Sequence, residues 1–147
     1  MLLSLAASAC GDPGASPGGP DAGGGGNLLS LAGTYQTRVT LLPGGTCSGV
    51  TVQDEVTVVE HPPGSSTLTL THAGQSYSGT VDPSAHFQTT PRTVLVSPAR
   101  YRIALSGLFT LTGLEATVSV EQTEPTTCTY SVQWVGTKAG APNVIPG

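Results

Sequence analysis

Three histidines, His61, His72 and His86, are the only imidazoles in the chain that could serve acid–base catalysis or metal binding. Their spacings of 11 and 14 residues match no local metal-ligand or catalytic motif. His61 precedes two prolines, His72 ends an extended segment, and His86 stands opposite Phe87 in the alternation. We expect all three to be exposed histidines in or near turns, and we expect no metal site and no cofactor.

Two carboxylates, Asp54 and Glu60, stand at even-numbered positions, as a row of valines does, so that all of them would fall on the same face of an extended segment. If that row faces inward, both carboxylates would enter one interior and could act as an acid/base pair. A bulged Asp and a Glu at a strand end are the commoner arrangement. The chain also lacks a Gly-x-Ser-x-Gly nucleophile elbow. We therefore expect no catalytic residue and no enzyme, with an envelope hydrolase as the least supported alternative.

The aromatic residues are few, and almost all fall on the inward parity of their segments. They are Tyr35, Tyr77, Phe87, Tyr101, Phe109, Tyr130 and Trp134. In an ordinary core they pack against one another. In a barrel of about eight strands, which can also hold one small ligand, they would line an apolar cavity.

These side chains must be positioned by strands, because polar and apolar residues alternate with period two along most of residues 31–137. Tyr101 to Leu111 is the longest such segment. In another, Val56 and Val58 are predicted to face inward and Thr57 outward. The repeating pattern gives eight or nine short segments separated by turn residues.

Short connections favour antiparallel neighbours, and one apolar face per strand requires the sheet to close or fold over on itself. We predict an all-β fold, an antiparallel up-and-down meander forming a small barrel, with a β-sandwich as the alternative. An immunoglobulin-type sandwich has Trp before the second cysteine, whereas here Trp134 follows Cys128. The segment Gly33-Thr34-Tyr35 resembles the Gly-x-Trp opening of lipocalin-like barrels, with Tyr in place of Trp. That resemblance implies a barrel and a carrier of a small apolar ligand.

The composition excludes a nucleic-acid partner. Of 147 residues only 14 are charged, the net charge is −4, and Lys138 is the single lysine. A nucleic-acid binder must neutralise several phosphates, so we expect no nucleic-acid partner. Glycine (20), proline (12) and an abundance of threonine favour turns and strands over helices.

The N-terminal residues join a short apolar stretch, Leu2 to Ala7, to small residues and then to Cys10. The run Ala7-Ser8-Ala9-Cys10-Gly11 resembles the lipobox of bacterial lipoproteins. In that family the signal is cut before the cysteine, whose thiol carries a diacylglycerol. The resemblance implies an export signal over residues 1–9, lipidation at Cys10 and, because Gly11 rather than Asp follows, the outer membrane. Ala7-Ser8-Ala9 also fits a conventional A-x-A cleavage site, which would give a secreted or periplasmic protein.

We expect the true signal to begin upstream of Met1, because no Lys or Arg precedes Arg38 and a signal normally opens with positive charge. Residues 11–26 contain eight glycines and three prolines. Such a segment buries too little apolar area to offset its ordering entropy. We therefore predict a flexible tether over residues 10–30, a β domain over residues 31–137, and a disordered tail over residues 138–147.

If Cys10 carries lipid, Cys47 and Cys128 remain, and in an oxidising compartment this pair predicts one disulfide. A zinc site is disfavoured because neither cysteine belongs to a C-x-x-C motif or has an adjacent His. A catalytic thiolate is disfavoured because no basic neighbour would lower its pKa.

The sequence thus leads to one main hypothesis, a non-catalytic, lipid-anchored lipoprotein of the cell envelope with a small β-barrel domain for binding or structure. Its expected partners are the membrane, another envelope protein, or a small apolar ligand. The competing hypothesis, a lipocalin-like carrier, requires a hollow interior, whereas a packed interior favours the first.

Overall fold

The computed structural model describes residues 28–146, and these form strands, turns and irregular connections. Within that range there is no helix long and apolar enough to cross a bilayer. The all-β prediction is confirmed. The strands are β2 (Gly33–Leu41), β3 (Glu55–Glu60), β4 (Thr67–His72), β5 (Gln75–Val81), β6 (His86–Thr89), β7 (Arg92–Val96), β8 (Ala99–Thr110), β9 (Gly113–Glu124) and β10 (Cys128–Lys138).

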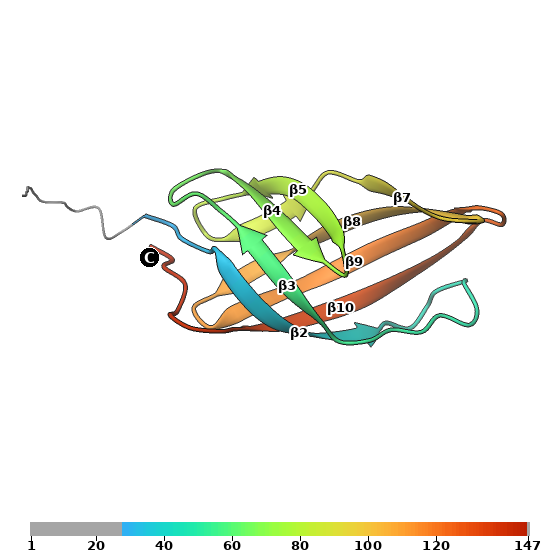
Figure 1. Ribbon diagram of the computed structural model, residues 1–147, viewed down its shortest axis with the longest axis horizontal. Coiled ribbons are helices and arrows are strands. Elements are labelled where there is room, and N and C mark those ends of the chain that lie inside the picture. The colour runs from blue at the N-terminus through green and yellow to red at the C-terminus, as the bar shows by residue number, and fades with distance from the viewer. Residues whose placement is uncertain (1–27, 147) are drawn as a thin grey trace, which may run out of the picture.

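The strands form one antiparallel sheet in the order β6-β5-β4-β3-β2-β10-β9-β8-β7. An additional pairing between β6 and β8 closes eight of them into a ring, so the predicted barrel is confirmed and the sandwich alternative is not (Figure 1). β8 has two neighbours along one edge. Its residues 106–108 pair with β6, and its residues 99–103 pair with β7.

Close approach of strands at the point of closure requires two glycines in the inner rows. A Cβ at Gly79 would lie 2.1 Å from the carbonyl oxygen of Gln88, and a Cβ at Gly107 would lie 2.1 Å from that of Glu115. Gly107 is also the Cα partner of Phe87 across the β6–β8 pairing. Glycine in a strand interior commonly marks a sharp bend of a small barrel, and these two allow the sheet to close.

The interior of the ring is filled by side chains. Tyr35, Phe87 and Phe109 form a chain of aromatic contacts, with ring centroids 5.8 Å apart for Tyr35 and Phe109 and 5.1 Å apart for Phe87 and Phe109. Tyr77 and Trp134 belong to the same buried cluster, together with leucines and valines of β3, β4, β5, β8, β9 and β10. Aromatic pairs in such geometries contribute beyond their buried area. The ring is therefore a packed core.

β3 presents the opposite face from the one the sequence predicted. Thr57 and Val59 are buried, whereas Val56 and Val58 are 40% and 41% exposed. The strand begins only at Glu55. A shift of one residue transfers every side chain of a strand to the other face, and here the buried threonine is satisfied by hydrogen bonds that the local pattern does not reveal.

Residues 28–30 and 138–146, the described parts of the expected tether and tail, contact each other and the barrel. Ser30 and Val144 pair through two backbone hydrogen bonds of 2.9 and 3.0 Å. Leu29, Leu31 and Asn143 are buried. Asn143 stays in place because its side-chain amide donates to the Thr110 carbonyl at 2.8 Å and its Oδ1 accepts from the Tyr35 hydroxyl at 2.9 Å. The two segments together close one end of the barrel.

The other end is open. β8, β9 and β10 have 11 or 12 residues each, whereas β3 to β6 have between four and seven. The long strands run beyond the ring toward the right of Figure 1, and the connection between β2 and β3 lies beside them. On this extension the inner face of the sheet is not covered by β3–β5.

Candidate functional site at the open end

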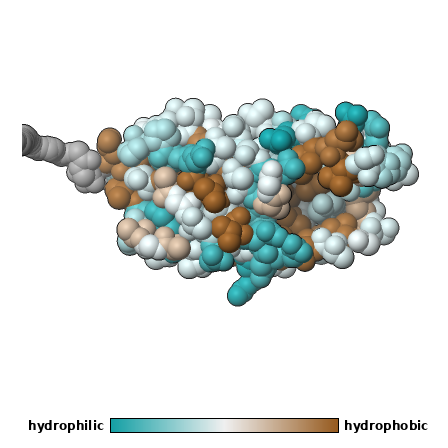
Figure 2. Space-filling view, viewed as in Figure 1, coloured by the Kyte–Doolittle hydropathy of each residue, from teal (hydrophilic) through white to brown (hydrophobic). Residues whose placement is uncertain are grey.

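A groove lies between the extension and the connection from β2 to β3, and we call it the open-end groove. It has a volume of about 460 Å³, which falls within the range of small-molecule sites. Its lining comprises Thr46, Cys47, Ser48, Gly49, Val50 and Thr51 from the connection, and Tyr101, Gln122, Thr126, Thr127, Cys128 and Tyr130 from the long strands and their turn. Figure 2 shows the molecule hollowed at this end.

Two tyrosines come into the groove from neighbouring long strands. Tyr101 stands on β8 and Tyr130 on β10, and both are half-buried. Burial, followed by the negative charge that an ionised Tyr101 would carry, raises the pKa of Tyr130. The Tyr130 hydroxyl is therefore neutral at physiological pH, where it can donate one hydrogen bond and accept others.

The wall opposite the strands is held in place at several points. Cys47 is joined to Cys128 by a disulfide, with Cα atoms 5.0 Å apart. The backbone N–H of Thr46 donates to the Thr129 carbonyl at 2.7 Å, and the N–H of Thr129 donates to Thr46 Oγ1 at 2.9 Å. At the far end of the connection, Asp54 Oδ1 accepts from the N–H of Val39 at 2.9 Å. The wall is thus fixed before any ligand arrives.

The groove lining in the described structure contains no Asp, Glu, Lys or Arg. Two charged residues near it in sequence form an ion pair, in which Arg100 Nε lies 3.1 Å from Glu124 Oε2. Gln122 supplies an amide, whose nitrogen donates to the Thr126 carbonyl at 3.0 Å. The groove therefore offers hydroxyls, amides and aromatic rings without a formal charge.

His72 is buried, with 9% of its surface exposed, which corrects the prediction of an exposed turn histidine. Its Nδ1 lies 2.8 Å from Thr57 Oγ1, and Thr57 Oγ1 lies 2.7 Å from Thr37 Oγ1. Its ring stacks on Trp134 at 4.1 Å. Burial lowers the pKa of His72, against a smaller opposing effect of the Glu55 carboxylate. The imidazole is a neutral member of an internal hydrogen-bond chain.

His61 is also buried, contrary to expectation, with 4% exposed. Its Nδ1 accepts from the N–H of Leu31 at 3.3 Å, and its Nε2 lies 2.8 Å from the Ser65 carbonyl. This pair of bonds is satisfied by the neutral tautomer with its proton on Nε2. His61 therefore helps to fix the segment that closes the far end of the barrel.

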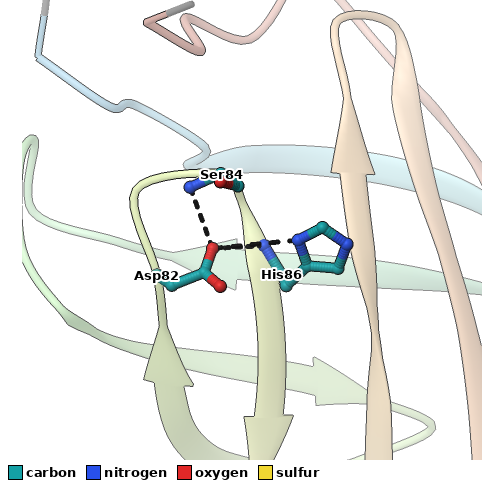
Figure 3. A network of polar contacts seen from close by, with 3 residues as sticks. All are labelled: Asp82, Ser84 and His86. Carbon is teal, nitrogen blue, oxygen red and sulfur yellow. Dashed lines mark hydrogen bonds and ion pairs between the residues drawn. The ribbon is translucent and has the colours of Figure 1, made fainter.

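His86 is exposed, as predicted, and Figure 3 shows it with Asp82 and Ser84 in the turn between β5 and β6. The residue types are those of a Ser-His-Asp triad, but the geometry is that of a capped turn. Asp82 Oδ1 accepts from the backbone N–H groups of Ser84 and His86 at 2.9 and 3.0 Å. His86 Nδ1 is 3.9 Å from the same oxygen. The triad relation of nucleophile, base and orienting carboxylate is not formed.

Asp54 and Glu60 do not meet inside the barrel. Both are exposed, and Glu60 stands on the outward row of β3 with Val56 and Val58. The predicted parity was wrong because the inward row of this strand contains Glu55, Thr57 and Val59. The acid/base pair is therefore not formed.

The predicted cavity lining divides into two groups. Tyr35, Tyr77, Phe87, Phe109 and Trp134 are buried in the packed interior, whereas Tyr101 and Tyr130 line the open-end groove. The predicted Cys47–Cys128 disulfide is confirmed. Cys10 and the predicted signal lie outside the described residues. Sequence analysis missed Gln122 and the Thr/Ser residues of residues 46–51, because their local pattern resembles that of any polar turn.

Residues 28–146 hold no group of three or more His, Cys, Asp or Glu side chains placed to bind a metal ion. Comparison of the chain with protein-family models, with curated proteins and with solved structures gives no match. The class of protein is therefore defined by the fold and the site themselves, as a small disulfide-linked β-barrel with a fixed groove at one end. The disulfide is typical of proteins that fold in an oxidising compartment outside the cytoplasm.

Proposed function

We propose that the protein is a lipid-anchored component of the bacterial cell envelope whose β-barrel is a non-catalytic binding module. One observation carries this proposal. The described chain reaches the barrel at its closed end, where Ser30 pairs with Val144, and the groove lies at the opposite end (Figure 1). An anchor at Cys10 would therefore attach the barrel by the end that does not carry the groove.

The composition of the groove supports binding rather than catalysis. General acid–base catalysis works best with a side chain whose pKa lies near the operating pH. In the described structure the lining contains no Asp, Glu, His, Lys or free thiol, and burial raises the pKa of Tyr130, which moves it further from that range. The two buried histidines do not line the groove. His72 contacts Thr57, and His61 contacts Leu31 and Ser65.

A lipocalin-like carrier is the second candidate that the sequence suggested. A ligand in the middle of the ring would have to displace the contacts between Tyr35, Phe87 and Phe109. Close-packed interiors resist such insertion. The packed core therefore favours the first candidate, a module that binds at its end.

The anchor is tested by producing the chain in a two-membrane bacterium, with an Arg-containing n-region joined ahead of Leu2, and feeding an alkyne-tagged fatty acid. We expect the wild-type protein to acquire the label and to remain in the membrane fraction. A Cys10→Ser variant removes the thiol that the lipid requires, so it should be unlabelled. A wild-type protein that is cleaved after Ala9, unlabelled and soluble would refute the anchor.

A further inference from the structure

The side chains around the open-end groove define the kind of ligand it can accept. They include four threonines, one serine, one glutamine and two tyrosines, and the lining in the described structure is uncharged. A charged ligand that left water for this groove would lose its hydration without gaining a counter-charge. Hydroxyl-rich, neutral ligands exchange their hydrogen bonds with water for equivalent bonds to Thr, Ser and Gln.

Tyr101 and Tyr130 pack against the hydrophobic core and also line the groove, so that what they can offer a ligand is their hydroxyls. A saccharide carries hydroxyls around its ring, and each of them can donate and accept a hydrogen bond as a phenol does. A purely aliphatic ligand would leave the hydroxyls and the amide of the groove without partners, which costs free energy.

The groove is also rigid at its base. The disulfide and the two hydrogen bonds between Thr46 and Thr129 hold its outer wall against β10. A wall that is already ordered reduces the conformational entropy that binding must offset. A lower entropic cost matters most for ligands that bind weakly, such as sugars, because for them this cost is large relative to the binding free energy.

We infer that the open-end groove binds an uncharged saccharide, held by Tyr101, Tyr130, Gln122 and the hydroxyls of the connection between β2 and β3. This inference rests on the proposed role of the barrel as a binding module and names its ligand class. A volume of about 460 Å³ accommodates a short oligosaccharide segment. In the envelope such a ligand would be a glycan chain.

The test uses the full chain carrying Cys10→Ser, in NMR titrations with maltotriose, cellotriose and N,N′,N″-triacetylchitotriose. Trigalacturonate serves as the charged counterpart. We expect at least one neutral trisaccharide to shift the amide signals of residues 46–51, 101, 122 and 126–130. Trigalacturonate should produce smaller shifts at the same concentration.

Two variants separate recognition from folding. Gln122→Ala removes an amide that lines the groove, and Gln133→Ala removes an exposed amide from the outer face of β10. Loss of one good hydrogen bond corresponds to about tenfold weaker binding, so Gln122→Ala should raise Kd by about that factor and Gln133→Ala should leave it unchanged. Tyr130→Phe, which keeps the ring, should also weaken binding several-fold.

Three results would each overturn the inference: no binding of any neutral trisaccharide at millimolar concentration, preference for trigalacturonate, or equal affinities of the Gln122→Ala and Gln133→Ala proteins. The labelling experiment at Cys10 is independent of these titrations. A protein that is lipid-anchored but does not bind sugar would refute the ligand class and leave the anchor intact.

Discussion

The disulfide between Cys47 and Cys128 offers the most direct quantitative test of the structure. It links the connection after β2 to the first residue of β10, across a sequence separation of 81 residues. In the chain-entropy model, closing a loop of this length lowers the conformational entropy of the unfolded chain and so stabilises the folded state by about 4–5 kcal/mol. Natural domains have total unfolding free energies of about 5–15 kcal/mol. The bond is therefore a large fraction of the stability.

We expect the double variant Cys47→Ser, Cys128→Ser to keep its fold. The hydrogen bonds from Thr46 to Thr129 and from Leu42 to Ser131 still attach the connection to β10. The variant should be less stable by about 4–5 kcal/mol. With an unfolding entropy of about 2.1 cal/mol/K per residue, this corresponds to a Tm lower by about 15–20 °C for a domain of this size.

The measurement is denaturant unfolding of the full chain carrying Cys10→Ser, with and without reductant. Reduced wild-type protein and the double variant should unfold at the same midpoint, and oxidised protein should unfold at a higher one. A difference below about 1 kcal/mol, well short of the loop-closure value, would refute the reasoning. Insensitivity of the wild-type protein to reductant would show that the bond does not form, and would remove the support for an oxidising compartment.

Three further predictions follow from side chains of the core. On β3, Val59→Ala should cost about 2–3 kcal/mol, whereas Val58→Ala should stay within about 0.5 kcal/mol, because Val59 is 2% and Val58 41% exposed; equal losses in denaturant unfolding would contradict the observed face. Because burial lowers the pKa of His72, the unfolded chain takes up a proton first as pH falls through about 6.5, so stability should drop there. His72→Gln should reduce that drop in unfolding experiments and His86→Gln should retain it; identical profiles would argue against a buried neutral His72. Tyr35→Phe should lower the free energy of unfolding by about 1–2 kcal/mol. Burial, partly offset by the hydrogen bond to Asn143, raises the pKa of the wild-type Tyr35 phenol to about 12. An ultraviolet titration in which all four tyrosines ionise together would therefore contradict the hydrogen-bonded interior.

The success of the sequence prediction varies with how continuous the alternation is. In each of β8, β9 and β10 one alternating row of residues is apolar almost throughout, and that row is the one that faces the core. Around β3 both parities contain valine, because Val56, Val58 and Val59 fall on two faces. The choice between them depends on Thr57, which bonds Thr37 and His72 from two other strands. A local pattern contains no information about such a partner.

The closed end was missed for a related reason. The pairing of Ser30 with Val144 joins the two ends of the described chain. Glycine, proline and short polar residues around both ends are typical of disorder, and only the barrel between them supplies the surface that orders them. Asn143 gains its two side-chain partners only because Tyr35 and Thr110 are already positioned by strands.

The groove exists because the strands are unequal in length. A ring closed by β6 and β8 needs only residues 106–108 of β8, so the first half of that strand is free to pair with β7 and to extend past the ring. The extension exposes an inner face that a core would bury under apolar side chains. Here that face carries Tyr101, Gln122 and Tyr130, and its cover is a polar connection fixed by a disulfide. A barrel stabilised at its closed end can therefore tolerate changes in residues 48–51, which line the groove and lie outside the hydrophobic cluster. The specificity of the groove can then vary without loss of the fold.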